Sequence, residues 1–269
     1  MSSEPPITRI DAEIVTPAPG DRLAHLSVHR GLIIRRALLI GAIRGFFPLP
    51  LLDEQIANRV VAGLLGKLAA GRQVDLPPAA AATLAANGGV LANLTIASAV
   101  VLVATFAGRK FLALLAAGRG ADEMAATFYR ATLFDHYCAQ LHVGGPITPG
   151  EALRLRTLIE AELAEMSLGP ALTAFREGGK VLGRTLLEAP RWLSQRIAAL
   201  AERFVRTGGN PDVIDAVVEP AEGGDEPWLD RAARLVEETL GGAGSEHLAK
   251  MIATFERRWQ AEPESPDAD

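Results

Sequence analysis

Asp135, Cys138 and His142 are the residues whose types and spacing come closest to a chemical site. On one helix, positions i, i+3 and i+7 share a face, and a carboxylate, a thiol and an imidazole suit either a transition metal or a thiol nucleophile. A thiol and an imidazole one turn apart on a helix point outward in parallel, however, and a lone cysteine commonly serves as a small buried hydrophobe. We therefore expect a structural role here and keep catalysis through this face as a lesser alternative.

His25 and His29 form the second group of this kind. They are four residues apart, so on one helix both imidazoles could reach a metal ion. The segment between Arg22 and Asp53 supplies no carboxylate or thiolate to complete the coordination, which favours a structural or surface role.

Two glycine and lysine strings, at 63–68 and 178–181, lack the spacing and the hydroxyl of a phosphate-binding loop. We therefore predict a non-catalytic protein with no cofactor and no metal.

The composition limits the architecture that could position these residues. Only 5% of the 269 residues are aromatic, and alanine, leucine, glycine and valine dominate. Strand-rich chains depend on β-branched and aromatic residues, so this mixture favours closely packed helices. The single cysteine excludes an intrachain disulfide and a cysteine-based metal cluster. The prediction is an all-α, Ala/Leu-rich helical bundle, with one membrane-inserted helix or hydrophobic hairpin as an option.

A long uncharged segment is the strongest feature of the chain. The 33 residues from Leu76 to Gly108 carry no charge, and Arg109 and Lys110 close the segment with a basic flank. As a helix, its second part, Gly88 to Gly108, would measure about 31 Å, close to the ~30 Å thickness of the hydrocarbon layer of a membrane. Its alanines and four hydroxyl or amide side chains also suit a central helix buried in a soluble bundle. The sequence leaves both alternatives open.

The charge distribution favours an anionic membrane surface as a partner. Residues 22–120 hold 11 basic and 3 acidic side chains, whereas residues 208–269 hold 5 and 15. The basic block suits anionic lipids, although the acidic C-terminal third could neutralise it within the molecule. The sequence pI of 5.6 and the absence of recognition motifs argue against nucleic acid. The N-terminus lacks the features of a secretory signal, so we expect the cytoplasmic side of the inner membrane, with a cytoplasmic protein as the alternative.

Proline, glycine and charge divide the chain into five parts. Acidic, proline-rich tails are expected at 1–21 and 260–269, a helical body at 22–206, a linker at 207–225 and a C-terminal helical hairpin at 226–259. Within the body, Gly71 is expected to stop one helix, and Gly118 and Gly120 to separate the uncharged segment from a helix over 122–142. Thr148 and Glu151 have the spacing of a capping box, which predicts a helix start at Pro149.

Residues 35–43, the proline-flanked run 48–53 and the helix end at 68–72 resemble the opening of a bacterial domain family of unknown function. That family includes YcjF-like membrane proteins and domains attached to some GTPases, and the resemblance covers about residues 30–140. It implies an α-helical, membrane-associated module with hydrophobic hairpins and no catalytic residues to carry over. The large C-terminal extension departs from this pattern.

The leading hypothesis is a membrane-associated, non-catalytic helical protein that acts through protein or lipid contacts. The alternative is a soluble scaffold or partner-binding protein in which 88–108 is the buried core helix. Replacing Val101 with Asp distinguishes them, because it should release a membrane protein into the soluble fraction but unfold a soluble bundle.

Overall fold

The computed structural model describes residues 21–46, 50–86, 109–188 and 227–261, and over these residues every regular element is a helix. The predicted all-α fold is confirmed. The elements are η1 (Asp21–Leu26, a 3-10 helix), α1 (Ser27–Phe46), α2 (Pro50–Gly71), α3 (Pro78–Ala85), α5 (Arg109–His136), the π-helical turn η3 (Tyr137–Leu141), α6 (Pro149–Glu165), α7 (Gly169–Glu188), α10 (Pro227–Thr239) and α11 (Gly242–Ala261). The predicted segment 88–108, the linker 207–225 and most of both tails lie outside the described residues.

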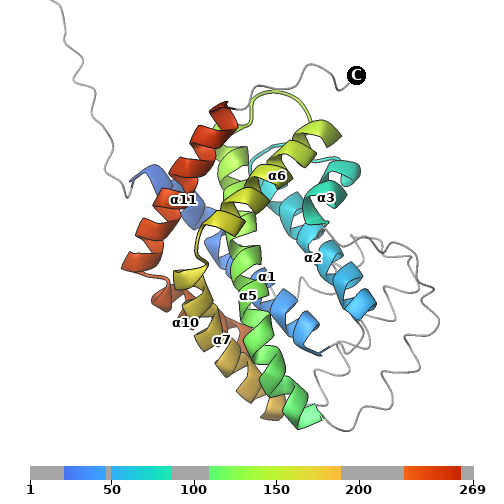
Figure 1. Ribbon diagram of the computed structural model, residues 1–269, viewed down its shortest axis with the longest axis vertical. Helices are drawn as coiled ribbons and strands as arrows, with labels where there is room; N and C mark the ends of the chain where they lie inside the picture. Colours follow the sequence, from blue (N-terminus) through green and yellow to red (C-terminus); the bar gives the residue numbers. More distant parts are fainter. Residues whose placement is uncertain (1–20, 47–49, 87–108, 189–226, 262–269) are drawn as a thin grey trace, which may run out of the picture.

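Helix α5 runs through the middle of the bundle (Figure 1). It contacts α1, α2, α6, α7 and α11, while α3 packs against α2 and α6, and α10 against α7 and α1. With 28 residues, α5 measures about 42 Å and can therefore reach most of the other helices.

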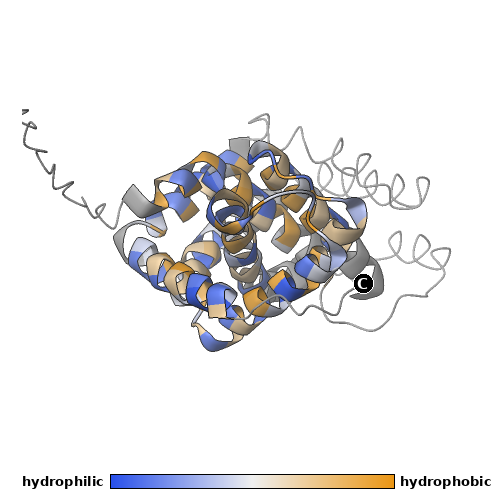
Figure 2. Cartoon of the chain, turned by 90° about the horizontal axis from the view of Figure 1, so that it is seen from above, coloured by the Kyte–Doolittle hydropathy of each residue, from blue (hydrophilic) through white to orange (hydrophobic). Residues whose placement is uncertain are grey.

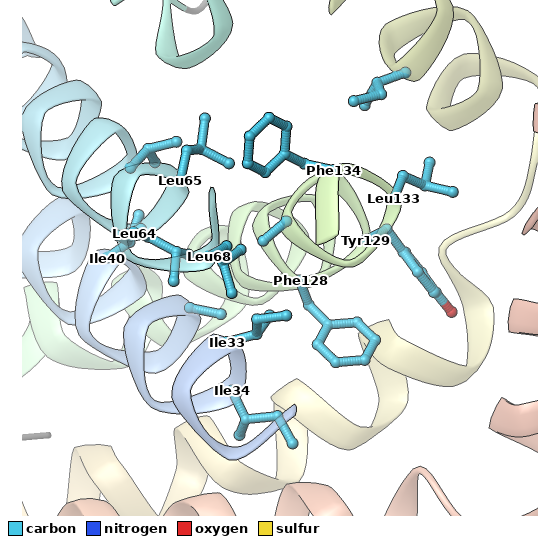
Figure 3. Packing of buried hydrophobic residues seen from close by; sticks show 14 of the residues in the cluster. Ile33, Ile34, Ile40, Leu64, Leu65, Leu68, Phe128, Tyr129, Leu133 and Phe134 are labelled. Atoms are coloured by element: carbon cyan, nitrogen blue, oxygen red, sulfur yellow. The ribbon is translucent and has the colours of Figure 1, made fainter. Parts of the chain in front are cut away.

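One hydrophobic cluster joins all the described α-helices. Figure 3 shows its centre: Phe134 of α5 points toward Leu65 of α2, and Phe128, on the other side of α5, lies beside Ile33 of α1. Figure 2 shows that the helices carry hydrophobic and hydrophilic residues side by side, the pattern that lets one stripe of each helix face a shared core.

The predicted break at Gly118 and Gly120 is wrong, because α5 continues through both glycines. A Cβ atom on Gly120 would lie 3.3 Å from the carbonyl oxygen of Gly41 in α1, and one on Gly41 would lie 2.0 Å from Cε of Met124. The two glycines therefore allow the backbones of α1 and α5 to cross closely, which outweighs the modest cost of glycine inside a helix.

The C-terminal helices α10 and α11 occupy most of the segment predicted as a hairpin at 226–259. Their apolar side chains belong to the common core: Leu229, Val236, Met251 and Phe255 are almost fully buried. The described C-terminal helices are therefore an integral part of the bundle.

Candidate functional site

Three histidines and their polar partners gather at the C-terminal end of α5. Four helices and the turn after α2 supply these polar side chains, which we call the histidine cluster. Its members are His25 of η1, His29 of α1, Arg72 after α2, Asp135 and His136 of α5, and Glu256 of α11. Each member is hydrogen-bonded to another member from a different part of the chain, so the cluster ties the N-terminal and C-terminal helices to α5.

Asp135 is the fully buried acceptor of the cluster. Nε of Arg72 donates to Oδ1 of Asp135 and an Nη atom of Arg72 donates to Oδ2, both at 2.8 Å. Nδ1 of His29 lies 2.8 Å from the same Oδ1. The hydrogen bond to Asp135 raises the pKa of the Arg72 guanidinium. A buried carboxylate with paired, two-point contacts to arginine is compensated in charge and fixed in orientation.

The end of α2 positions Arg72. Backbone N–H groups of Gln73 and Val74 return to the carbonyl oxygens of Ala70 and Ala69, at 3.0 and 2.9 Å, which closes a Schellman motif. Gln73 takes the left-handed conformation of this motif, with φ of 60°. The guanidinium of Arg72 also donates to the carbonyl oxygen of His25, at 2.6 Å, so this one side chain holds η1 as well as α5.

Gly71 is the last residue of α2, as predicted, and it has a second role at the histidine cluster. The residue that turns the chain is Gln73, whereas a Cβ atom on Gly71 would lie 2.5 Å from Nε2 of His29. Gly71 is therefore required for the close approach of the imidazole, which in turn reaches Asp135.

A second branch of the cluster runs from His25 through His136 to Glu256. Nε2 of His25 and Nδ1 of His136 are 3.0 Å apart, and Nε2 of His136 lies 2.9 Å from Oε1 of Glu256. An ionised Glu256 accepts the Nε2 proton of neutral His136, so Nδ1 of His136 must accept a proton from His25. Burial lowers the pKa of His136 and nearby His25 lowers it further, while Glu256 opposes both effects.

A separate network lies just beyond, on the turn η3 and at the start of α6. The Tyr137 hydroxyl donates to Oε1 of Glu151, and Nδ1 of His142 lies 3.1 Å from the same hydroxyl and 3.2 Å from Oε1 of Glu151. Nε2 of His142 donates to the carbonyl oxygen of Gly145 at 3.0 Å. Glu151 also completes the predicted capping box with Thr148, which is confirmed.

Asp135, Cys138 and His142 do not form the predicted single helical face. The π-helical turn follows α5, and His142 has left the helix for an extended conformation. Asp135 enters the histidine cluster and His142 the network of Tyr137 and Glu151. Residue Cys138 is 7% exposed, and burial raises the pKa of its thiol, which keeps the side chain in the poorly nucleophilic thiol form.

The arrangement is suited to holding protons and fixing helix positions. Within the described ranges, no group of three or more His, Cys, Asp or Glu side chains has the geometry to hold a metal ion. Hydrogen bonds link the imidazoles to each other and to carboxylates, which allows a proton to be shared or exchanged between them.

Gly88, Val101 and Gly108, predicted to form the membrane segment, lie outside the described residues. Arg109 and Lys110, the predicted basic flank, are the first two residues of α5. None of the described helices combines the length and apolar character that crossing a membrane requires.

The sequence did not reveal the cluster because its contacts join residues 63 to 120 positions apart. His25 and His29 were considered with ligands from their own segment, whereas Asp135 and Glu256 come from distant helices. The available signal was the small number of histidines: three of the chain's five, at 25, 29 and 136, belong to the cluster.

Comparison of the chain with protein-family models, curated protein sequences and solved structures finds no match. The resemblance of residues 30–140 to YcjF-like membrane proteins therefore stays a prediction.

Proposed function

We propose that the chain is a membrane-attached helical module that acts through lipid and protein contacts rather than catalysis. The observation that carries this proposal is the uncharged run from Leu76 to Gly108, most of which separates α3 from α5. The basic flank at Arg109 and Lys110 and the net positive charge of residues 22–120 suit the anionic surface of a cytoplasmic leaflet.

The described core supports this hypothesis over that of a soluble scaffold. The scaffold hypothesis uses 88–108 as the central helix, but α5 has that central position in the described bundle. Ile34, Leu64 and Phe134 of α1, α2 and α5 are almost fully buried in one hydrophobic cluster.

The two flanking helices limit how the segment attaches. A single crossing would place α3 and α5 on opposite sides of the membrane, yet Leu84 of α3 and Phe134 of α5 belong to one core. A second crossing by α5 is disfavoured because none of the described helices meets the requirements for a span. We therefore favour attachment in which the segment enters and leaves the same leaflet, with α3 and α5 on the cytoplasmic side.

Val101→Asp tests the attachment. A charge in the middle of an inserted segment costs about 2.5–3.5 kcal/mol, so the variant should move from the membrane pellet to the soluble fraction while remaining folded. Val143→Asp is the matched control, because Val143 is 93% exposed in the loop after η3 and should leave partitioning unchanged. Wild-type protein that stays in the supernatant with anionic vesicles would refute the proposal. Aggregation of the Val101→Asp variant would instead favour the buried-helix alternative.

Labelling from one side of the membrane tests the topology. In a Cys138→Ser background, single cysteines at Ala86 and Lys110 mark the two ends of the segment. Same-leaflet attachment predicts that an impermeant maleimide labels both positions from the same side of sealed vesicles. Labelling from opposite sides would contradict it.

A further inference from the structure

The paired imidazoles of His25 and His136 join an N-terminal element to the centre of the bundle. Their nitrogens are 3.0 Å apart and their ring centroids 5.2 Å apart. His136 is 2% exposed, whereas Glu256, which accepts from its other nitrogen, has a side chain 40% exposed. Protons can therefore reach the buried pair through a carboxylate at the surface.

Counting protons shows why this pair responds to pH. With both imidazoles neutral, His25 donates to Nδ1 of His136. One added proton is accommodated because cationic His136 then donates to both His25 and Glu256. A second proton places two N–H groups and two positive charges against each other at 3.0 Å. The closed pair therefore holds one extra proton and excludes a second.

The surrounding charged and titratable groups of the described residues do not remove this limit. They include His29 of α1, Arg72 after α2, Asp135 of α5, Cys138 of η3 and Glu256 of α11. The carboxylate of Asp135 is already hydrogen-bonded to Arg72 and His29. Arg72 also places a positive charge beside the backbone of His25. Glu256 can balance one imidazolium.

Of the two elements that this branch of the cluster joins to α5, η1 has fewer apolar contacts than α11. Its buried apolar side chain is Leu26, with Leu23 partly buried against the core. The other partner, α11, buries Leu248, Met251, Ile252 and Phe255. Mutual repulsion of two cations should therefore displace η1 while α11 stays in place.

We propose that His25 and His136 form a proton-operated latch that holds η1 against α5 near neutral pH and releases it in mild acid. Release would free the N-terminal part of the chain and expose His136, so the described bundle would respond to acidity at this end. The latch does not depend on membrane attachment, because all its members lie in the described bundle.

The size of the response follows from the number of protons bound. Free imidazoles have a pKa of about 6.5. When the pH falls from about 7.5 to 5.5, proton binding to both imidazoles of the open form therefore favours opening by roughly 100-fold. Burial lowers the pKa of His136 below that of a free imidazole, so the single proton that the closed pair binds offsets no more than about 10-fold of this change. The opening equilibrium of η1 should therefore increase by about 10-fold to 100-fold over this range.

Hydrogen exchange on the purified full-length protein measures this opening directly. After correction for the intrinsic pH dependence of exchange, protection of amides near residues 24–29 should fall by about 10-fold to 100-fold in acid. In His25→Gln and in His136→Gln only one imidazole is left to bind a proton on opening, so the change cannot exceed about 10-fold and should be smaller than in the wild-type protein. Protection in the middle of α11 should change little in all proteins.

His247→Gln is the matched control because it removes a histidine of α11 that is outside the cluster, and it should retain the full wild-type response. Circular dichroism near neutral pH checks that each variant is folded, and His25→Gln alters a partly exposed residue of η1, so its effect on folding should be small. A wild-type change below about 3-fold would overturn the latch. A full response in both His25→Gln and His136→Gln would also overturn it.

Discussion

Asp135→Asn should destabilise the bundle strongly while changing its shape very little. The substitution keeps the size of the side chain but removes the charge that compensates Arg72. Asp135 is fully buried, and the Arg72 side chain is only 15% exposed. Removing one partner of a buried ion pair typically costs 3–5 kcal/mol, because the remaining charge is left without compensation. The Asn oxygen can still accept one hydrogen bond from Arg72, so we expect the lower end, about 3 kcal/mol.

Urea unfolding followed by circular dichroism measures this loss, and thermal unfolding should show a Tm lower by about 6–12 °C. Asp230→Asn is the matched control, because it breaks the ion pair with Arg35, whose side chains are 32% and 24% exposed. An ion pair of that exposure contributes less, about 1 kcal/mol or below.

A double-mutant cycle with Arg72→Gln separates the pair from general disruption. If the two side chains act together, the double variant should lose at least about 2 kcal/mol less than the sum of the two single variants. Additive losses, or a loss below about 1 kcal/mol for Asp135→Asn, would refute the central role of this ion pair.

Two further predictions concern the backbone and the tyrosines. Gln73 is exposed and has φ of 60°, a backbone conformation that strains every residue with a side chain more than it strains glycine. Gln73→Gly should therefore raise the free energy of unfolding by about 0.5–1 kcal/mol. An unchanged or lower urea midpoint would contradict this relief of strain. Burial raises the pKa of Tyr129 to about 12 and also raises that of Tyr137, and these are the two tyrosines of the chain. Because unfolded tyrosine ionises near pH 10, the tyrosine contribution to stability should be constant below that pH and fall above it by up to ~1.4 kcal/mol per pH unit for each tyrosine. Tyrosinate absorbance and the urea midpoint test this, and tyrosinate absorbance appearing around pH 10 in the folded protein would contradict it.

Local signals in the sequence predicted local structure well. Thr148 and Glu151 form the predicted capping box because all its bonds lie within four residues. The helical fold class also followed from composition and three- to four-residue spacing. These features depend on neighbours along the chain, so the sequence contains the information directly.

Glycine was misinterpreted where its role depended on another helix. The sequence predicts a helix break at Gly120, which instead lies inside α5 and allows the crossing with Gly41. Gly71 ends α2 as predicted but also makes room for His29. A single sequence shows that a side chain is absent but not what occupies the space. The histidine cluster was inaccessible for the same reason, since Asp135 meets His29 and Arg72 only after three helices have packed.

The long separations within the histidine cluster also have a consequence for protein synthesis. Glu256 is linked to His25 by two hydrogen bonds through His136, but it is synthesised 231 residues after His25. The surfaces of α5 and α7 that α10 and α11 cover therefore stay exposed until these two helices have left the ribosome. Contacts between residues so far apart in the sequence slow folding, and they leave apolar surface exposed in the nascent chain. A ribosome-bound chain ending before α10 should consequently be a better chaperone substrate than the finished protein.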